Sequence, residues 1–318
     1  MDVLSEVLRV VRLEGALFFN GEFSAPWCLS TKPAALAPFF SAEARQLIIY
    51  HLITGGRAYA QLGEGRREEL TSGDVVVFPH GDHHYLGNGS AEPVDSVKTF
   101  AKNLSEGLKV ARFGGGGEVT RFVCGFMTCE LRLGEVFLSG LPPIMKVRIV
   151  EDEADQWLER SIRFSVGERA DSNAGSELVR TKLAEVLFVE TLRRYINELP
   201  ANEVGWLAGV RDSFVGHALA LMHKNPAHPW TIAELGRQIG LSRSRIAERF
   251  QHFLGESPMS YLSKWRLKLG AEMLLSGDHS IAEVAAAVGY GSEATFNRAF
   301  KRQFNIPPAQ FRKRTRHS

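Results

Sequence analysis

The sequence predicts an α+β protein with a β-rich N-terminal part, connecting helices and an all-α C-terminal part that contains two helix-turn-helix units. Three observations predict this class. The 318 residues exceed the usual size of one domain. Between residues 18 and 150, short apolar runs alternate with glycine pairs and polar turns, as in β-sandwiches and barrels. In the last third, a pattern of short helix, glycine turn and second helix occurs twice. The expected parts are residues 1–165, 166–210 and 211–318.

Bulk composition narrows the class of protein. The chain is 44% hydrophobic and 23% charged, which is ordinary for a globular protein. No apolar run approaches the roughly 20 residues of a membrane span, and the N-terminus lacks the pattern of a signal peptide. Three cysteines without CxxC spacing suggest neither a disulfide framework nor a zinc site made of cysteines alone. We therefore expect a cytoplasmic protein without a membrane partner.

Charge is divided unevenly along the chain. Residues 1–210 carry 22 basic and 28 acidic side chains, whereas residues 211–318 carry 16 and 8. A basic C-terminal third is typical of a protein that binds a polyanion such as DNA. The alternative is a charged surface that is merely solvated.

In the N-terminal part we expect a helix over Val3–Leu13 and then a series of short strands. Runs rich in β-branched and aromatic residues predict strands at Leu47–Ile53, Ala58–Leu62, Val75–Phe78 and Phe122–Leu131. Many short strands without long helices between them favour a sandwich or a barrel.

The connector is expected to begin at the polar, turn-rich residues 166–175 and to continue as a helix over Ser176–Leu199. Its apolar positions form a face that is too wide for packing against one partner alone. The alternative is a helix that packs wholly against its own β-rich part.

The C-terminal part repeats itself at an offset of 49 residues, with TIAELGRQIG from Thr231 and SIAEVAAAVG from Ser280. Thr231 and Ser280 are expected to cap a short helix, and the glutamate three residues later is expected to complete a capping box. A glycine then ends each helix. Each turn leads into a second helix, whose expected buried residues are Ile246, Phe250 and Phe253 in the first unit and Phe296, Phe300 and Phe304 in the second.

These segments carry a family resemblance. The stretch SEATFNRAFKRQFNIPP from Ser292 to Pro308 resembles the signature of the AraC/XylS family of bacterial transcription activators, and GESP at Gly255–Pro258 is similar to its counterpart there. The resemblance covers about residues 211–315. It implies a seven-helix domain whose two recognition helices enter successive major grooves of double-stranded DNA, about 34 Å apart. It also implies a bacterial regulator that forms a homodimer through helices of its N-terminal domain and contacts RNA polymerase.

Helical geometry picks out the side chains that could face DNA. Stepping 100° per residue from the buried Ile246 or Phe296 gives the opposite face of each second helix. The predicted DNA contacts, which include positions aligned with the family's base contacts, are Arg243, Ser244, Arg245, Glu248, Arg249, Thr295, Asn297, Arg298, Lys301 and Arg302. Arg298 suits guanine, Asn297 adenine and Glu248 the amino group of cytosine. Phosphate contacts are expected from Arg243, Arg249, Lys301 and Arg302. The alternative for each is a solvated position.

The stretch GDVVVFPHGDHHYLGN, from Gly73 to Asn88, contains three histidines. Its spacing, G-x5-P-x-G-x2-H-x3-N, resembles the second cupin motif, and residues 1–150 resemble the cupin domain that precedes AraC-type DNA-binding domains. This resemblance implies a β-barrel that senses a small effector or a metal, or that mediates dimerisation. We expect His84 to face inward, and His80 and His83 to lie at the barrel mouth or in solvent.

A metal site is one interpretation of this motif. The H-x-H pair of metal-dependent cupins is missing between residues 27 and 56, but His51, His84 and Cys124 could meet inside the barrel. Ligation by His and Cys favours zinc, or another divalent metal. In the alternative, His84 makes a structural hydrogen bond within its turn and His51 is a satisfied core residue.

Three functions compete. The favoured one is a sequence-specific transcription regulator, which predicts no catalytic residues and no enzymatic activity. The second is a cupin-type metal-dependent enzyme, a dioxygenase or isomerase, fused to a helical domain; the missing H-x-H pair and the helical repeat count against it. The third is an architectural DNA-binding protein without an effector, which predicts little sequence preference.

Overall fold

The computed structural model describes residues 3–11, 14–40, 47–105, 108–128, 138, 140–149, 156–166, 174–277 and 279–315. These residues form two compact units. The β-rich unit holds all the strands with α2 (Pro33–Phe40), α3 (Ser96–Ser105), α5 (Gln156–Ser165) and α6 (Ser176–Glu198). The helical unit holds α1 (Val3–Val11) and the helices that follow residue 199. None of the helices in the described residues is both long and apolar enough to cross a membrane.

Eleven strands of the described residues form two sheets. They are β1 (Glu14–Ser24), β2 (Trp27–Thr31), β3 (Leu47–Gly55), β4 (Arg57–Leu62), β5 (Arg67–Thr71), β6 (Asp74–Phe78), β7 (His84–Asn88), β8 (Val94–Asp95), β9 (Val110–Gly114), β10 (Val119–Thr128) and β11 (Met145–Arg148). The strand order is β11-β6-β3-β10-β1-β9 in one sheet and β5-β4-β7-β2-β8 in the other. The four predicted strands are confirmed, except that residues 129–131 lie outside the described residues. The strands are arranged as two mixed sheets rather than as one closed barrel.

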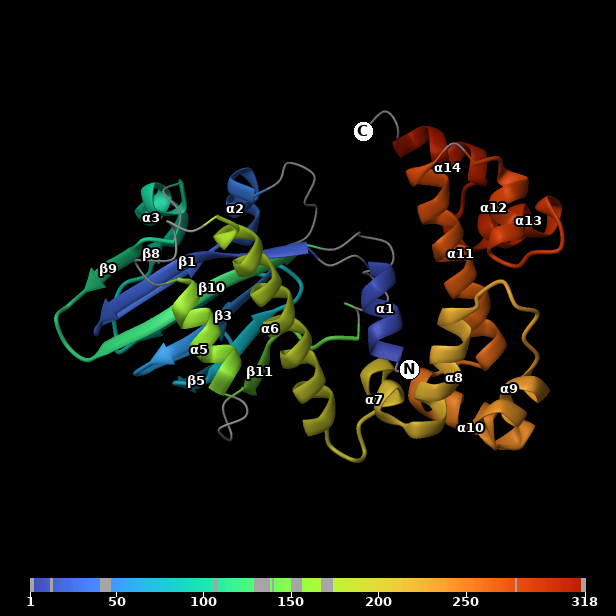
Figure 1. Cartoon of the computed structure of the whole chain (residues 1–318), viewed down its shortest axis with the longest axis horizontal. Coiled ribbons are helices and arrows are strands. Elements are labelled where there is room, and N and C mark those ends of the chain that lie inside the picture. Colours follow the sequence, from blue (N-terminus) through green and yellow to red (C-terminus); the bar gives the residue numbers. More distant parts are fainter. Residues whose placement is uncertain are drawn as a thin grey trace. The chain divides into compact units, whose positions relative to one another are not determined.

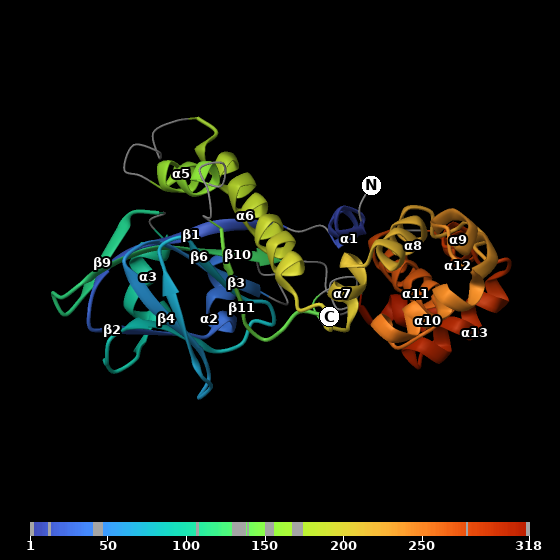
Figure 2. The same ribbon diagram turned by 90° about the horizontal axis from the view of Figure 1, so that it is seen from below.

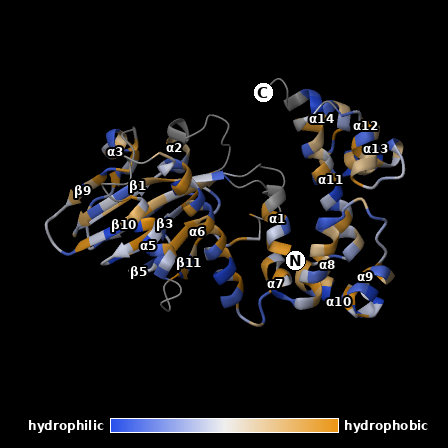
Figure 3. Ribbon diagram, in the orientation of Figure 1, coloured by the Kyte–Doolittle hydropathy of each residue, from blue (hydrophilic) through white to orange (hydrophobic). Residues whose placement is uncertain are grey.

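The core of the β-rich unit lies between the two sheets. It combines residues of the six-stranded sheet, such as Phe23, Val76 and Phe122, with residues of the five-stranded sheet, such as Leu70 and Leu86. Figure 3 shows hydrophobic residues concentrated in the strands of both sheets and along α6. The alternation of side chains along each strand therefore places one set of apolar residues in this shared interior.

The outer face of the six-stranded sheet is also buried, because α6 lies across it (Figures 1 and 2). Strands β3 and β6 are consequently buried on both faces, which explains their nearly continuous apolar sequences. The α6 residues buried by this packing are Ala184, Leu187, Phe188, Thr191, Leu192 and Ile196. The large apolar residues of α6 that remain exposed are Leu178, Val179, Val186 and Val189.

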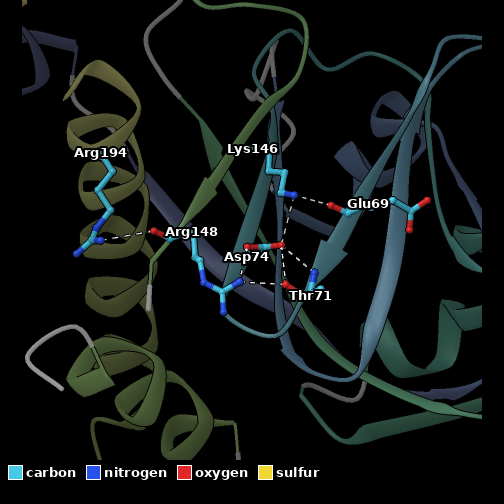
Figure 4. Close-up of polar contacts among 6 residues, drawn as sticks. All are labelled: Glu69, Thr71, Asp74, Lys146, Arg148 and Arg194. Carbon is cyan, nitrogen blue, oxygen red and sulfur yellow. Dashed lines mark hydrogen bonds and ion pairs between the residues drawn. The ribbon is translucent and has the colours of Figure 1, made fainter. Parts of the chain in front are cut away.

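A polar cluster fastens the edge of this sheet (Figure 4). The buried carboxylate of Asp74 accepts hydrogen bonds from the N–H (2.8 Å) and the hydroxyl (3.1 Å) of Thr71. Arg148 on β11 approaches the same carboxylate at 3.4 Å and Lys146 at 3.6 Å. On the α6 side, Arg194 donates to the backbone carbonyl of Arg148 at 3.5 Å. The cluster therefore ties β11 both to the β5–β6 turn and to α6.

The helical unit contains both predicted helix-turn-helix units. Its elements after residue 199 are α7 (Trp206–Arg211), α8 (Ser213–Lys224), α9 (Ile232–Ile239), α10 (Arg243–Leu254), α11 (Pro258–Ser276), α12 (Ile281–Ala287), α13 (Glu293–Phe304) and α14 (Pro308–Thr315). The first unit is α9–α10 and the second is α12–α13. Helices α8 to α14 are the seven that the family resemblance implied for residues 211–315.

The two units differ from the expected division at two helices. Helix α1 packs against α8 in the helical unit, although the sequence places it with the β-rich part. Helix α6 packs on the six-stranded sheet, although it was expected in a separate connector. Both helices lie next to a domain boundary in the sequence, where an apolar helical face does not reveal its partner.

Side-chain caps start the first helix of each helix-turn-helix unit. Thr231 Oγ1 accepts from the N–H of Glu234 at 3.2 Å, and Ser280 Oγ accepts from the N–H of Glu283 at 3.1 Å. In α12 the capping box is complete, because the Glu283 carboxylate accepts from the N–H of Ser280 at 2.7 Å. In α9 the structure differs from the prediction, since the Glu234 carboxylate instead contacts His228 at 2.8 Å.

Glycines form the turns between the two helices of each unit. Gly240 has φ +75° and ends α9, and Gly289 has φ +84° and follows α12. These positive φ values favour glycine over residues with a side chain. At Gly289 a Cβ atom would in addition lie 2.7 Å from the backbone of Ala227. The predicted glycine turns are thus required by backbone geometry.

Candidate DNA interface and the buried histidine pair

The second helix of each unit is anchored by one apolar face and exposes the other. Ile246 and Phe250 hold α10, and Phe296 and Phe300 hold α13; each is at most 1% exposed. Phe253 and Phe304, also predicted for the core, are half-buried. On the opposite faces, the predicted DNA contacts that the structure leaves exposed are Arg243, Ser244, Arg245, Glu248, Thr295, Arg298, Lys301 and Arg302.

The start of α13 combines a cap with a candidate base contact. Ser292 Oγ accepts from the N–H of Thr295 at 3.2 Å, and the two hydroxyl oxygens lie 2.9 Å apart. Arg298 Nη2 donates to Thr295 Oγ1 over a long 3.4 Å. Because this contact is long and solvent-exposed, the guanidinium can turn toward a base at little cost. Asn297 is half-buried, with its amide 3.5 Å from the Glu293 carboxylate.

The exposed face of α10 carries charges of both signs. Arg245 and Glu248 form an ion pair at 3.7 Å, and their side chains are 69% and 66% exposed. Ion pairs of this kind contribute little to stability, so both side chains remain able to contact DNA. Ser244 Oγ lies 3.2 Å from Oγ of the capping residue Ser242.

Arg249 differs from the other predicted contacts because it is engaged inside the helical unit. Its Nε donates to Asp212 Oδ1 at 3.2 Å, Nη2 contacts Oδ2, and the guanidinium lies over the ring of Phe214. Asp212 in turn caps α8 by accepting from two backbone N–H groups. Burial acts to raise the pKa of Asp212, but the hydrogen bonds from Arg249 and α8 outweigh burial and lower it. Arg249 therefore fastens α10 to α8, a contact that its predicted phosphate role would have to break.

The three candidate ligands of the N-terminal part do meet in the interior. His51 on β3 and Cys124 on β10 are directly opposite in the six-stranded sheet, and His51 Nδ1 lies 2.8 Å from Cys124 Sγ. His84 comes from β7 in the facing sheet, and its Nε2 lies 3.0 Å from His51 Nε2. Its ring stacks on Phe78 at 3.8 Å. The cluster thus joins the two sheets across the core.

The partners of each nitrogen assign one consistent arrangement of protons. His84 Nδ1–H donates to the backbone carbonyl of Asp82 at 2.9 Å, which leaves Nε2 as an acceptor. His51 Nε2–H donates to that acceptor, and His51 Nδ1 then accepts from the Cys124 thiol. Burial lowers the pKa of His84 to about 4, lowers that of His51 well below its usual value, and raises that of Cys124 well above its usual value. All three groups are therefore neutral and hydrogen-bonded.

This geometry does not fit a metal centre. A metal needs donor atoms that converge on one point, whereas the two nitrogens of His51 point toward different partners. Among the described residues, no group of three or more His, Cys, Asp or Glu side chains is arranged to hold a metal ion. The contacts match the alternative interpretation, with a structural hydrogen bond from His84 within its turn and a satisfied core His51.

The other two histidines of the motif contact the protein. His83 lies 2.8 Å from the hydroxyl of Ser30 on β2, and His80 lies 3.0 Å from the carbonyl of Leu141. Both are half-buried. They were expected at the mouth of the barrel or in solvent, but the neighbouring strand and the segment before β11 supply partners that the local sequence does not reveal.

Comparison with known proteins decides the family. The family described as Cupin matches residues 2–197, and the one described as Helix-turn-helix domain matches residues 235–314. An AraC-like transcription regulator of Streptomyces lividans is 37% identical over an alignment of 317 positions, which covers 98% of each chain. This chain belongs to the AraC-like transcription regulators.

Two further proteins give the range of similarity to this AraC-like regulator. The HTH-type transcriptional regulator AlkR of Acinetobacter baylyi is 26% identical over 99% of this chain and all of its own length. A solved structure of an AraC-type transcriptional regulator from Chromobacterium violaceum is 27% identical, with a TM-score of 0.32, over 33% of this chain and 94% of that one. The family membership and the helix-turn-helix match, rather than the structural similarity, show that the regulator binds DNA to control transcription. The relatives are transcription regulators, so the enzyme alternative is not supported.

The stability of the regulator's β-rich unit is expected to fall as the pH is lowered from about 6.5 toward 4. Over this range the unfolded chain takes up protons on His51 and His84, whereas the folded chain keeps both neutral. Each histidine should therefore lower the free energy of unfolding by up to about 1.4 kcal/mol per pH unit. Urea unfolding at several pH values, followed by circular dichroism, measures this slope. His84→Gln should reduce it and the exposed His279→Gln should not; a flat profile above pH 4 would contradict the assignment.

Proposed function

We propose that this AraC-like regulator binds its operator as a homodimer in the bacterial cytoplasm, contacts RNA polymerase there, and responds to a small effector held in its cupin domain. The observation that carries the DNA-binding part is the pair of capped, well-anchored helices α10 and α13, each of which exposes a polar face. The basic character of residues 211–318 supports the same proposal, because it favours contact with phosphates.

We assign the reading of bases to the exposed face of each recognition helix. Arg298 is the candidate for guanine on α13, and Glu248 is the candidate for cytosine on α10. Asn297 is proposed for adenine, for which its side chain must turn away from Glu293. Lys301, Arg302 and Arg243 are proposed to contact phosphates, which position the protein without specifying a sequence.

Selection of binding sites from random double-stranded DNA by the full chain tests this proposal. We expect a consensus sequence to emerge. The affinity of the chain for this sequence should fall steeply with salt, with a slope of log affinity against log salt concentration of close to one unit for each phosphate contact. An architectural binder would select no conserved sequence. Failure to bind DNA at any salt concentration would exclude the proposal altogether.

The exposed apolar stripe of α6 supports a homodimer. Leu178, Val179, Val186 and Val189 fall within a sector of about 100° on a helical wheel, on the side of α6 away from the packed residues Ala184, Leu187 and Thr191. On the neighbouring α5, Trp157 is 55% and Phe164 81% exposed. Large apolar side chains gathered on one face are typical of a protein interface. A second copy is the proposed occupant, because regulators with this architecture bind paired operator sites as dimers.

Charged substitutions on this stripe are expected to separate the dimer without unfolding the chain. In the double variant Leu178→Asp/Val186→Asp, both carboxylates would be buried in the interface without partners, which costs several kcal/mol. Analytical ultracentrifugation should then find monomers at concentrations where the natural chain is dimeric. Glu177→Arg, a charge change at an exposed position of the same helix, should leave the dimer intact. A dimer that survives the double variant would place the interface elsewhere.

A further inference from the structure

A small cavity lies beside the buried histidine pair. Its volume is about 20 Å³, which holds about one water molecule. The walls come from β1, β2, β3 and β10 and from helices α2 and α3. Most of the lining is apolar, with Phe19, Leu29, Phe100 and Leu104 among it. The cavity is therefore a place in the cupin domain where a ligand could meet the core.

The polar groups of the cavity are few and uncharged. Thr31 donates from Oγ1 to Ser96 Oγ at 3.0 Å, which leaves the Ser96 hydroxyl proton able to donate to a ligand. His51 and Cys124 also line the cavity, but they bond to each other and are neutral. No lining residue carries a charge that could pair with a charged ligand. An ion would thus lose its hydration without gaining a partner, which disfavours its binding strongly.

Helix α3 forms the wall of the cavity whose last turn is the most able to move. Its backbone leaves the helical conformation at Phe100, with φ −115° and ψ 18°, and the Phe100 ring packs edge-on against Phe19 at 5.2 Å. Because the helix is already interrupted there, the following turn with Leu104 can move without breaking a continuous ladder of hydrogen bonds. A ligand larger than water would have to displace Leu104 and Phe100, whose ring also packs against Phe23 at 5.3 Å and Phe113 at 5.8 Å.

We propose that this cavity is the effector site and that it takes a small, uncharged, mostly apolar molecule with one hydrogen-bonding group, which meets the hydroxyl of Ser96. The apolar lining supplies the affinity, and Ser96 orients the ligand. The role of this ligand as an effector rests on the proposed regulatory function, but its binding can be measured without DNA.

Three probes of similar size and different charge test the site on the full chain: benzyl alcohol, benzoate and benzylamine. Titrations followed by ligand-observed NMR give their dissociation constants. We expect benzyl alcohol to bind at least about tenfold more tightly than either ion, because no lining residue can pair with a charge. Equal or tighter binding of benzoate or benzylamine would overturn the proposal.

Variants of the lining connect the binding to this cavity. Leu29→Phe fills the space from the rigid strand β2 and should weaken benzyl alcohol at least about fivefold, whereas Phe100→Leu enlarges the space and should strengthen it. Ser96→Ala should weaken benzyl alcohol about fivefold, the contribution of one neutral hydrogen bond, and should leave toluene unchanged. If neither the natural chain nor Phe100→Leu binds benzyl alcohol, or if Leu29→Phe has no effect, the site is wrong.

Operator affinity measured on the same preparations separates the two proposals. If the chain binds its selected DNA but no neutral probe, the proposed function is supported and the cavity site is excluded. If the chain binds benzyl alcohol in the cavity but no DNA, the cavity site is supported and the proposed function is excluded. Circular dichroism of each lining variant shows whether the β-rich unit remains folded, because the substitutions lie in that unit and DNA binding by the helical unit does not report on it.

Discussion

Replacing Phe300 with alanine is expected to lower the free energy of unfolding of the helical unit by about 3–5 kcal/mol. The Phe300 side chain is fully buried, and its ring contacts Phe296, Phe304 and Phe311 at centroid distances of 5.3, 4.5 and 5.0 Å. Its removal leaves a cavity where α13 meets α14. Since domains are stable by only about 5–15 kcal/mol, the second helix-turn-helix unit would then be partly unfolded.

Urea unfolding followed by circular dichroism measures this loss, and DNA binding should weaken in parallel. Gln303→Ala is the matched control, because Gln303 is exposed on the same helix and its truncation should change stability by less than about 0.5 kcal/mol. A Phe300→Ala variant that keeps both its stability and its affinity for the selected DNA would contradict the packing described for α13.

Arg298→Ala is expected to weaken binding to the selected DNA by about 1–3 kcal/mol, roughly 5- to 150-fold, through the loss of a bidentate contact to guanine. The loss of affinity should be confined to DNA sequences that carry guanine at the contacted position. The variant should therefore no longer prefer guanine at that position. Arg298 is exposed and its one described bond is long, so stability should not change. Affinities for DNAs that carry each of the four base pairs at every position of the site measure the effect.

Arg302→Ala serves as the comparison for Arg298→Ala. Arg302 is exposed one turn further along α13 and is proposed to contact phosphate. Its loss should weaken binding to all DNA sequences equally. The slope of log affinity against log salt concentration should become shallower by about one unit. If Arg298→Ala behaved in this uniform way, its role in reading bases would be excluded.

Much of the helical unit could be predicted from the sequence because its signals are local. The caps Thr231 and Ser280, the turn glycines and the buried phenylalanines of α13 lie within a few residues of the helices that they define. Each was expected where it occurs, because helical periodicity and capping need no knowledge of distant residues. The exceptions were Glu234, whose partner His228 lies before the helix, and Phe253 and Phe304, which are half-buried rather than buried.

Contacts between distant residues could not be predicted in the same way. Arg249 fits the charge pattern of a phosphate contact, but its partner Asp212 lies 37 residues earlier and offers no local signal. The meeting of His51, His84 and Cys124 was anticipated, whereas the direction of each ring nitrogen depends on the spacing of two facing sheets. The sequence therefore left the metal site open, and the direction of the ring nitrogens in the structure counts against it.

Both helix-turn-helix units of one chain are expected to read DNA together. Methylation protection of guanines in the selected DNA, with the full chain bound, tests it most directly because it reports contacts in the major groove. For each protomer on the DNA we predict two protected segments whose centres lie about 10–10.5 base pairs apart, with α10 in one and α13 in the other. Arg298→Ala should remove protection from one segment and Ser244→Ala should alter only the other. Protection of a single segment per protomer, or loss of both segments together in either variant, would show that the two units do not read DNA together.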